Sequence, residues 1–272
     1  MTTVTLRQFF WAPWLLSLLG VQGTLPANAQ PQKGLQLSVM RVIYPEKAVQ
    51  GITFAVTNNA PESYLIQSRV TPWDAKTSDD TTLASPFIVT PPLKRLDAGE
   101  TSTLRIRKTQ KALPTDRESV FGFHVKGIPG QPLPSVADKA SKATLPKQNV
   151  KMVFALQYTL KLFYRPSELP PYDAVQVAKA LQFSYHDKKL VVKNPSAFYV
   201  TFDTLAFAAH EIDGDALFDM VPPFGQRTYP LPASDAQGML TWRIITDIGG
   251  KTEPLTRMLS SSASLIQKQQ GE

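Results

Sequence analysis

Apolar and polar residues alternate along several short stretches of this chain. Residues 52–57, 64–70 and 119–125 place apolar side chains at about every second position, and Asn, Asp, Gly and Pro residues separate these stretches. A period of two is typical of a β-strand with one buried face. Repeated short strands between such turns favour a β-sandwich, so we predict an all-β fold.

A second series of short apolar runs lies nearer the C-terminus, at residues 180–185, 189–193, 199–208 and 240–246. Residues 165–171 separate the two series, and their three prolines cannot continue a central strand. We place a domain boundary there and expect two immunoglobulin-like β-sandwich domains, residues 30–165 and 166–272. The window at residues 173–181 is interpreted as a loop or the entry to a strand.

The N-terminus has the features of an export signal. Arg7 precedes an apolar run at residues 9–19, and Ala27 and Ala29 form the small-x-small pattern of a cleavage site. The run is shorter than the roughly 20 residues that a transmembrane helix requires. We predict a signal peptide at residues 1–29 that is removed on export; the alternative is a buried core strand or helix.

The longest strand pattern covers residues 150–163. Its even-numbered positions form an unbroken apolar column, whereas its odd-numbered positions are smaller and mixed. Fourteen residues would span roughly 45 Å, more than one sandwich covers. We expect the core to cover only part of the even column and the N-terminal part of this column to stand free for a partner, whereas Val153 on the odd face packs in the core. The alternative is a central strand buried on both faces.

Composition excludes several classes of chemistry. The chain has no cysteine and three histidines, which rules out disulfides, thiol nucleophiles and thiolate metal sites. It contains no nucleophile-elbow, P-loop, dinucleotide-binding or zinc-protease motif. The net charge of +7 is not accompanied by an aromatic–basic cluster that would indicate nucleic-acid binding. We expect no catalytic residue, no metal, no cofactor and no nucleic-acid partner.

Several motifs occur in a characteristic order. They are RVIYP at residues 41–45, FIVTPPLKRL at 87–96, LRI at 104–106, DRESVF at 116–121, KLFYRP at 161–166, NPSAFYV at 194–200 and TDIGG at 246–250. In this order, they resemble the signatures of periplasmic pilus chaperones, the PapD-like family of the chaperone–usher pathway. The resemblance covers nearly all of the chain after the export signal.

This resemblance implies a boomerang of two immunoglobulin-like domains in the periplasm. Such a chaperone binds, folds and caps pilus subunits by donating a strand, and delivers them to an outer-membrane usher. The donor residues would be Val150, Met152, Phe154 and Leu156, and a free chaperone would cap itself by forming an oligomer. A structural immunoglobulin-like pilus subunit or adhesin domain is the alternative. Its N-terminal donor extension is not evident here, because the strongest strand is internal and the termini are polar.

The resemblance also assigns roles to charged residues. Arg41 and Lys161 match the basic pair that anchors the terminal carboxylate of a subunit. Glu118, Arg165 and Asp247 match a charge network between the domains, to which we assign a role in orientation.

One departure from the family pattern concerns the loop at residues 130–148. The loop is long, and family members with long loops usually carry a cysteine pair near it, whereas this chain has no cysteine. Both the short-loop and the long-loop subclass therefore stay open, as do the two products associated with them, rod-like pili and thin fibres.

Overall fold

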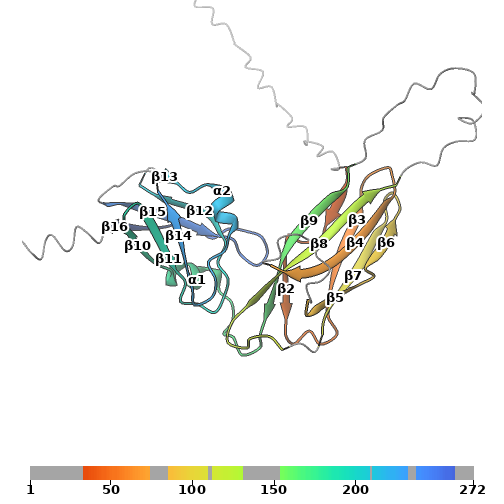
Figure 1. Cartoon of the computed structure of the whole chain (residues 1–272), viewed down its shortest axis with the longest axis horizontal. Coiled ribbons are helices and arrows are strands. Elements are labelled where there is room, and N and C mark those ends of the chain that lie inside the picture. Colours follow the sequence, from red (N-terminus) through yellow and green to blue (C-terminus); the bar gives the residue numbers. More distant parts are fainter. Residues whose placement is uncertain are drawn as a thin grey trace, which may run out of the picture. The chain divides into compact units, whose positions relative to one another are not determined.

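The computed structural model describes residues 33–73, 85–109, 112–130, 154–208, 210–231 and 237–260. In this part of the chain it contains sixteen strands and two short helices (Figure 1). The predicted signal peptide lies outside the described residues, as do Val150, Met152 and Val153. The prediction of an all-β fold is confirmed.

The first sandwich is built from nine strands in two sheets. The strands are β1 Leu35–Leu37, β2 Arg41–Pro45, β3 Ile52–Asn58, β4 Tyr64–Pro72, β5 Phe87–Thr90, β6 Leu93–Leu96, β7 Thr101–Lys108, β8 Ser119–Pro129 and β9 Leu156–Arg165. One sheet has the order β1-β3-β7-β5 and the other the order β2-β9-β8-β4-β6. The runs predicted from alternation at residues 52–57, 64–70 and 119–125 fall in β3, β4 and β8.

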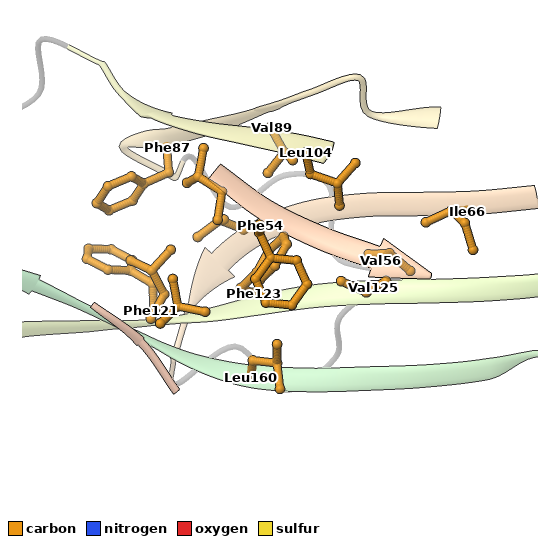
Figure 2. Close-up of a cluster of buried hydrophobic side chains, with 14 of the residues drawn as sticks. Phe54, Val56, Ile66, Phe87, Val89, Leu104, Phe121, Phe123, Val125 and Leu160 are labelled. Atoms are coloured by element: carbon orange, nitrogen blue, oxygen red, sulfur yellow. The ribbon is translucent and has the colours of Figure 1, made fainter. Parts of the chain in front are cut away.

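The core of the first sandwich lies between its two sheets. Figure 2 shows the side chains of both sheets pointing toward one another, with Leu160 of β9 among them. Phe54 and Phe123 meet edge to face, with their ring centroids 4.9 Å apart. Phe87 and Phe121 do the same at 5.0 Å. Such pairs add roughly 0.5–1.5 kcal/mol to the free energy gained by burial, so this core holds the two sheets firmly together.

The second sandwich is built from seven strands. They are β10 Gln182–His186, β11 Lys189–Lys193, β12 Phe202–Phe207, β13 His210–Glu211, β14 Gln226–Pro230, β15 Gln237–Ile244 and β16 Leu255–Ser260. They form one sheet of order β10-β11-β14 and a second of order β13-β12-β15-β16. The second predicted series of strands falls in β10, β11, β12 and β15.

The prediction of a loop or strand entry at residues 173–181 is wrong, because α1 covers Ala174–Ala180. Asp173 caps this helix: its side chain accepts hydrogen bonds from the backbone N–H groups of Val175 and Gln176 at 2.8 and 3.1 Å. Val177 and Ala178 are buried in the core of the second sandwich. The cap and this apolar contact stabilise a helix that is too short to persist alone.

The other helix, α2, covers Gly214–Phe218 and also belongs to the second sandwich. Asp213 caps it by accepting a hydrogen bond from the backbone N–H of Asp215 at 3.1 Å. Leu217 is buried in the core of that sandwich, whereas Phe218 is exposed. Within the described residues, no helix is both long enough and apolar enough to cross a membrane.

Candidate functional site

The strand β9 has one free edge over its first half. It pairs antiparallel with β8 along most of its length, from Leu156 opposite Gly127 to Tyr164 opposite Ser119. On its other side β2 runs parallel to it, and this pairing begins only where Arg41 lies opposite Lys161. In the described part of the chain, residues 156–160 therefore have a partner strand on one side only. A free edge of this kind can pair with a strand from another chain.

The even-numbered residues of β9 face the core of the first sandwich. Leu160, Leu162 and Tyr164 are buried there, and Tyr158 packs against the same cluster, whereas Thr159 is exposed. The expectation that the core covers only part of the even column describes this strand. Large apolar residues occupy the even positions, and these are the side chains that the facing sheet covers. The expectation for Val153 lies outside the described residues.

The start of the same apolar column is uncovered. Leu156 is 48% exposed and Phe154, just before the strand, is 70% exposed. The predicted strand at residues 150–163 is shorter in the described residues, because β9 begins at Leu156. The alternative of a central strand buried on both faces does not describe this segment, since its first half has exposed side chains. Two apolar side chains thus stand free beside an unpaired backbone edge.

Arg41 lies where the free edge ends and is only 8% exposed. Its guanidinium stacks 4.0 Å from the ring centroid of Phe163 and donates a hydrogen bond from Nη1 to Thr201 Oγ1 at 3.2 Å. Its Nε atom lies 3.9 Å from an oxygen of Asp247. Burial lowers the pKa of this guanidinium below its usual range, but arginine keeps its charge at neutral pH. Arg41 is therefore a fixed, oriented cation.

Lys161 lies opposite Arg41, on β9. Its ammonium donates a hydrogen bond to the backbone oxygen of Phe218 at 2.7 Å. It also lies 4.3 Å from the ring centroid of Phe218 and 5.3 Å from that of Trp73. Burial, together with the neighbouring charge of Arg41, lowers the pKa of Lys161 to about 8. The structure thus brings together the two cations that the sequence singled out, and Lys161 is not a freely solvated surface charge.

A hollow of about 420 Å³ adjoins these two cations. Its lining includes Met40, Leu217 and Ile245, so it is largely apolar around the charged groups. Charge-assisted hydrogen bonds are stronger in such a partly desolvated place than in water. The two cations can bind a carboxylate, and the apolar lining of the hollow can contact an apolar side chain next to that carboxylate.

Glu118, Arg165 and Asp247 also come together. Arg165 donates to Glu118 Oε1 from Nε at 2.9 Å and from Nη2 at 2.6 Å. Toward Asp247 it donates from Nη1 at 2.7 Å and from Nη2 at 3.1 Å, a two-pronged contact. The other oxygen of Glu118 accepts a hydrogen bond from the backbone N–H of Tyr199 at 2.8 Å. These bonds connect side chains of the first sandwich with the second.

Asp247 links this network to Arg41, a connection that the sequence does not indicate. The same carboxylate contacts Arg165 at 2.7 Å and approaches Arg41 to 3.9 Å. Sequence reasoning also missed Thr201, Trp73 and Phe218. No motif marks these three residues; they reach Arg41 and Lys161 only through the folding of distant segments. In the described residues, no group of three or more His, Cys, Asp or Glu could hold a metal ion.

Two family models match the chain. Residues 34–170 match the model described as "Pili and flagellar-assembly chaperone, PapD N-terminal domain", and residues 176–255 match "Pili assembly chaperone PapD, C-terminal domain". The chain therefore belongs to the PapD-like family of pilus assembly chaperones, as its motifs indicated.

Individual relatives agree with this assignment. The chain is 34% identical to the chaperone protein caf1M of Yersinia pestis over 243 residues, covering 87% of this chain and 88% of that protein. It is 36% identical to the chaperone protein FimC of Escherichia coli K12 over 231 residues, covering 84% and 86%. Among solved structures, the SafA pilin–SafB chaperone complex of Salmonella enterica matches with a TM-score of 0.68 and 31% identity, covering 85% of this chain and 99% of that one.

Proposed function

We propose that this chain is a periplasmic chaperone that binds, folds and caps pilus subunits and delivers them to an outer-membrane usher. Membership of the PapD-like family supports the class of protein. The observation that carries the mechanism is the free edge of β9, which ends at two cations. The proposal includes removal of the predicted signal peptide at residues 1–29 and no catalytic activity. A structural pilus subunit or adhesin domain is not favoured, because the relatives described above are chaperones.

In this mechanism the subunit adds a strand along residues 156–160. Backbone hydrogen bonds supply part of the affinity, and the exposed side chains of Phe154 and Leu156 fill an apolar groove in the subunit. Each such side chain contributes roughly 1.5–3 kcal/mol when it is fully buried. Val150 and Met152, outside the described residues, are proposed to continue the same column.

The position of the cations sets the direction of the added strand. A subunit strand whose C-terminal carboxylate reaches Arg41 and Lys161 runs beside β9 from residue 156 to residue 160 and ends where β2 begins. It must then run parallel to β9, in line with β2. Leu156 and Lys161 are five residues, or about 16 Å, apart along the strand. The anchor therefore fixes which subunit side chains face Leu156, because a slip of one residue would reverse the faces.

Arg41 and Lys161 are proposed to bind that carboxylate together. Arg41 is held by Phe163 and Thr201, and Lys161 by Phe218, so both cations are oriented before the carboxylate arrives. Preorganised donors lose little conformational entropy on binding. Glu118, Arg165 and Asp247 are proposed to fix the orientation of the two domains and, through Asp247, the position of Arg41.

A charged residue at position 154 or 156 tests the donor strand. We expect Phe154→Glu and Leu156→Glu to reduce capture of a co-expressed pilus subunit at least a hundredfold, because an unpaired charge would enter an apolar groove. Folding should be unchanged, since both side chains are exposed. Capture is measured by co-purification from periplasmic extracts, and folding by circular dichroism.

Two further substitutions serve as controls for this test. Met258→Glu places the same charge on an exposed strand residue of the second sandwich, and capture should match that of the wild type. Leu160→Glu lies in the same column of β9 but is 3% exposed, so it should unfold the first sandwich. Normal capture by both Phe154→Glu and Leu156→Glu would contradict the donor role.

The pH dependence of capture tests the anchor. The pKa of Lys161 is about 8, so the ammonium loses its proton as the pH rises through this value. A bound carboxylate favours the charged form, so binding takes up a proton above pH 8 and weakens by up to about tenfold per pH unit. Affinity measured between pH 7 and 10 should show this decline. Lys161→Arg should remove it, because a guanidinium stays charged throughout the range; the same decline in this variant would contradict the assignment.

A further inference from the structure

The ammonium of Lys161 lies against two aromatic rings. Trp73 lies just after β4 in the first sandwich, and Phe218 is the last residue of α2 in the second. The two ring centroids are 5.7 Å apart with the planes tilted by 35°, and each ring contacts the ammonium. The Phe218 backbone oxygen also accepts the Lys161 hydrogen bond. Aromatic faces attract a cation, most strongly where water is excluded.

The position of Phe218 is fixed by its neighbours. Leu217 is buried in the core of the second sandwich, so α2 cannot move without disturbing that core. Beyond the helix, Arg227 donates to the backbone oxygen of Met220 at 3.1 Å and to Asp219 at 2.8 Å. Phe218 itself is 56% exposed and adds little to the core. Phe218 therefore presents its ring to the Lys161 ammonium from a fixed position.

We propose that Trp73 and Phe218 form an aromatic clamp that holds the Lys161 ammonium in position for the terminal carboxylate of a subunit. Both are positioning residues, because they act through Lys161. This inference rests on the proposed function of Lys161 as an anchor. An ammonium has three N–H donors, so the bond to Phe218 leaves two for a carboxylate.

The clamp draws its residues from both sandwiches. Lys161 and Trp73 come from the first, whereas the second supplies Phe218. The charged groups near the ammonium are Arg41, Asp219 and, across the hollow, Asp203, which pairs with Lys251 at 2.8 Å. None of these carboxylates hydrogen-bonds to Lys161 in the described structure; the carbonyl and the two rings are its contacts. The cation is held by neutral groups and keeps its charge for an incoming anion.

Substitution of each ring by leucine tests the clamp, because leucine keeps apolar bulk but removes the aromatic face. We expect Phe218→Leu and Trp73→Leu to weaken subunit capture about tenfold each, with folding unchanged. In the free protein, loss of an aromatic face while the apolar bulk remains removes an interaction that favours the charged form, so the pKa of Lys161 should fall further in both variants. The pH titration of the lysine Cε signals by NMR measures this, with Lys161→Arg identifying the signal.

Phe224→Leu is the matched control. Phe224 is an exposed aromatic residue of the second sandwich that lies 5.2 Å from the Arg117 guanidinium, away from the hollow. This variant should capture subunit and titrate as the wild type does. Wild-type titration of Lys161 in both clamp variants, or wild-type capture by both, would overturn the clamp. Normal capture by Lys161→Ala would instead contradict the proposed role of Lys161 as the carboxylate anchor. That result is distinguishable from a failure of the clamp, which is measured in the Phe218→Leu and Trp73→Leu variants.

Discussion

Replacement of Lys161 by alanine is expected to abolish subunit capture while the chaperone stays folded. The substitution removes one of two cations from a partly desolvated site, and a buried charge that loses its partner is destabilised by about 2–5 kcal/mol. Capture should fall by at least thirtyfold, enough to remove the subunit from a co-purification. The Lys161 side chain belongs to neither hydrophobic core, so the melting temperature should change little.

Arg41 requires a different substitution. Its guanidinium is buried against Phe163 and bonded to Thr201, so Arg41→Ala would remove packing as well as charge. Arg41→Lys keeps the charge but loses the flat, forked donor, and should weaken capture more than it weakens folding.

Retention of normal capture by Lys161→Ala, in protein that melts like the wild type, would show that the carboxylate anchor lies elsewhere.

The largest effect on stability is expected from Arg165→Ala. This change leaves Glu118, which is 2% exposed, without the guanidinium that donates two hydrogen bonds to it. Breaking a buried pair by removing one partner destabilises a protein by about 3–5 kcal/mol. For a chain of this size that corresponds to a melting temperature lower by roughly 10 °C. The small-angle scattering profile should change too, because the bonds between the sandwiches are lost.

Arg95→Ala provides the comparison for Arg165→Ala. Arg95 pairs with Asp97 at 2.8 Å, but both side chains are exposed. Exposed pairs contribute about 0–1 kcal/mol, so this variant should melt within a few degrees of the wild type. Similar melting of the two variants, with scattering identical to that of the wild type, would show that Glu118, Arg165 and Asp247 do not act as a network.

Much of this arrangement could be predicted because its signals are local in the sequence. Alternation located strands such as β3, β4 and β8, since a half-buried strand repeats every two residues. The motif around Lys161 and Arg165 indicated a basic pair and an interdomain charge network. The structure brings the members of each set together.

Alternation alone does not show which face of β9 packs in the core. The pattern separates two faces but does not say which one meets the other sheet, and the even column proved to be the core face. Its exposed start, at Phe154 and Leu156, is therefore a continuation of the core face beyond the part that the facing sheet covers. The helix α1 was missed because its cap and its buried contacts outweigh the weak propensity of a short segment.

The contacts of Trp73, Thr201 and Phe218 had no signal in the sequence. Each depends on segments that are distant along the chain, such as β9 and α2, and on the packing of Leu217 that fixes α2. Motifs could indicate the cations, but only the folded arrangement indicates what holds them.

Hydrogen–deuterium exchange of β9 reports on whether a pilus subunit pairs with the free edge at residues 156–160. The purified chaperone and its complex with a co-expressed subunit are compared, with residues 161–165, already paired with β2, as the internal reference. We predict that exchange in residues 156–160 slows at least tenfold in the complex, because free amides gain a partner strand. A complex that forms while exchange in this segment stays at the rate of the free chaperone would contradict the account.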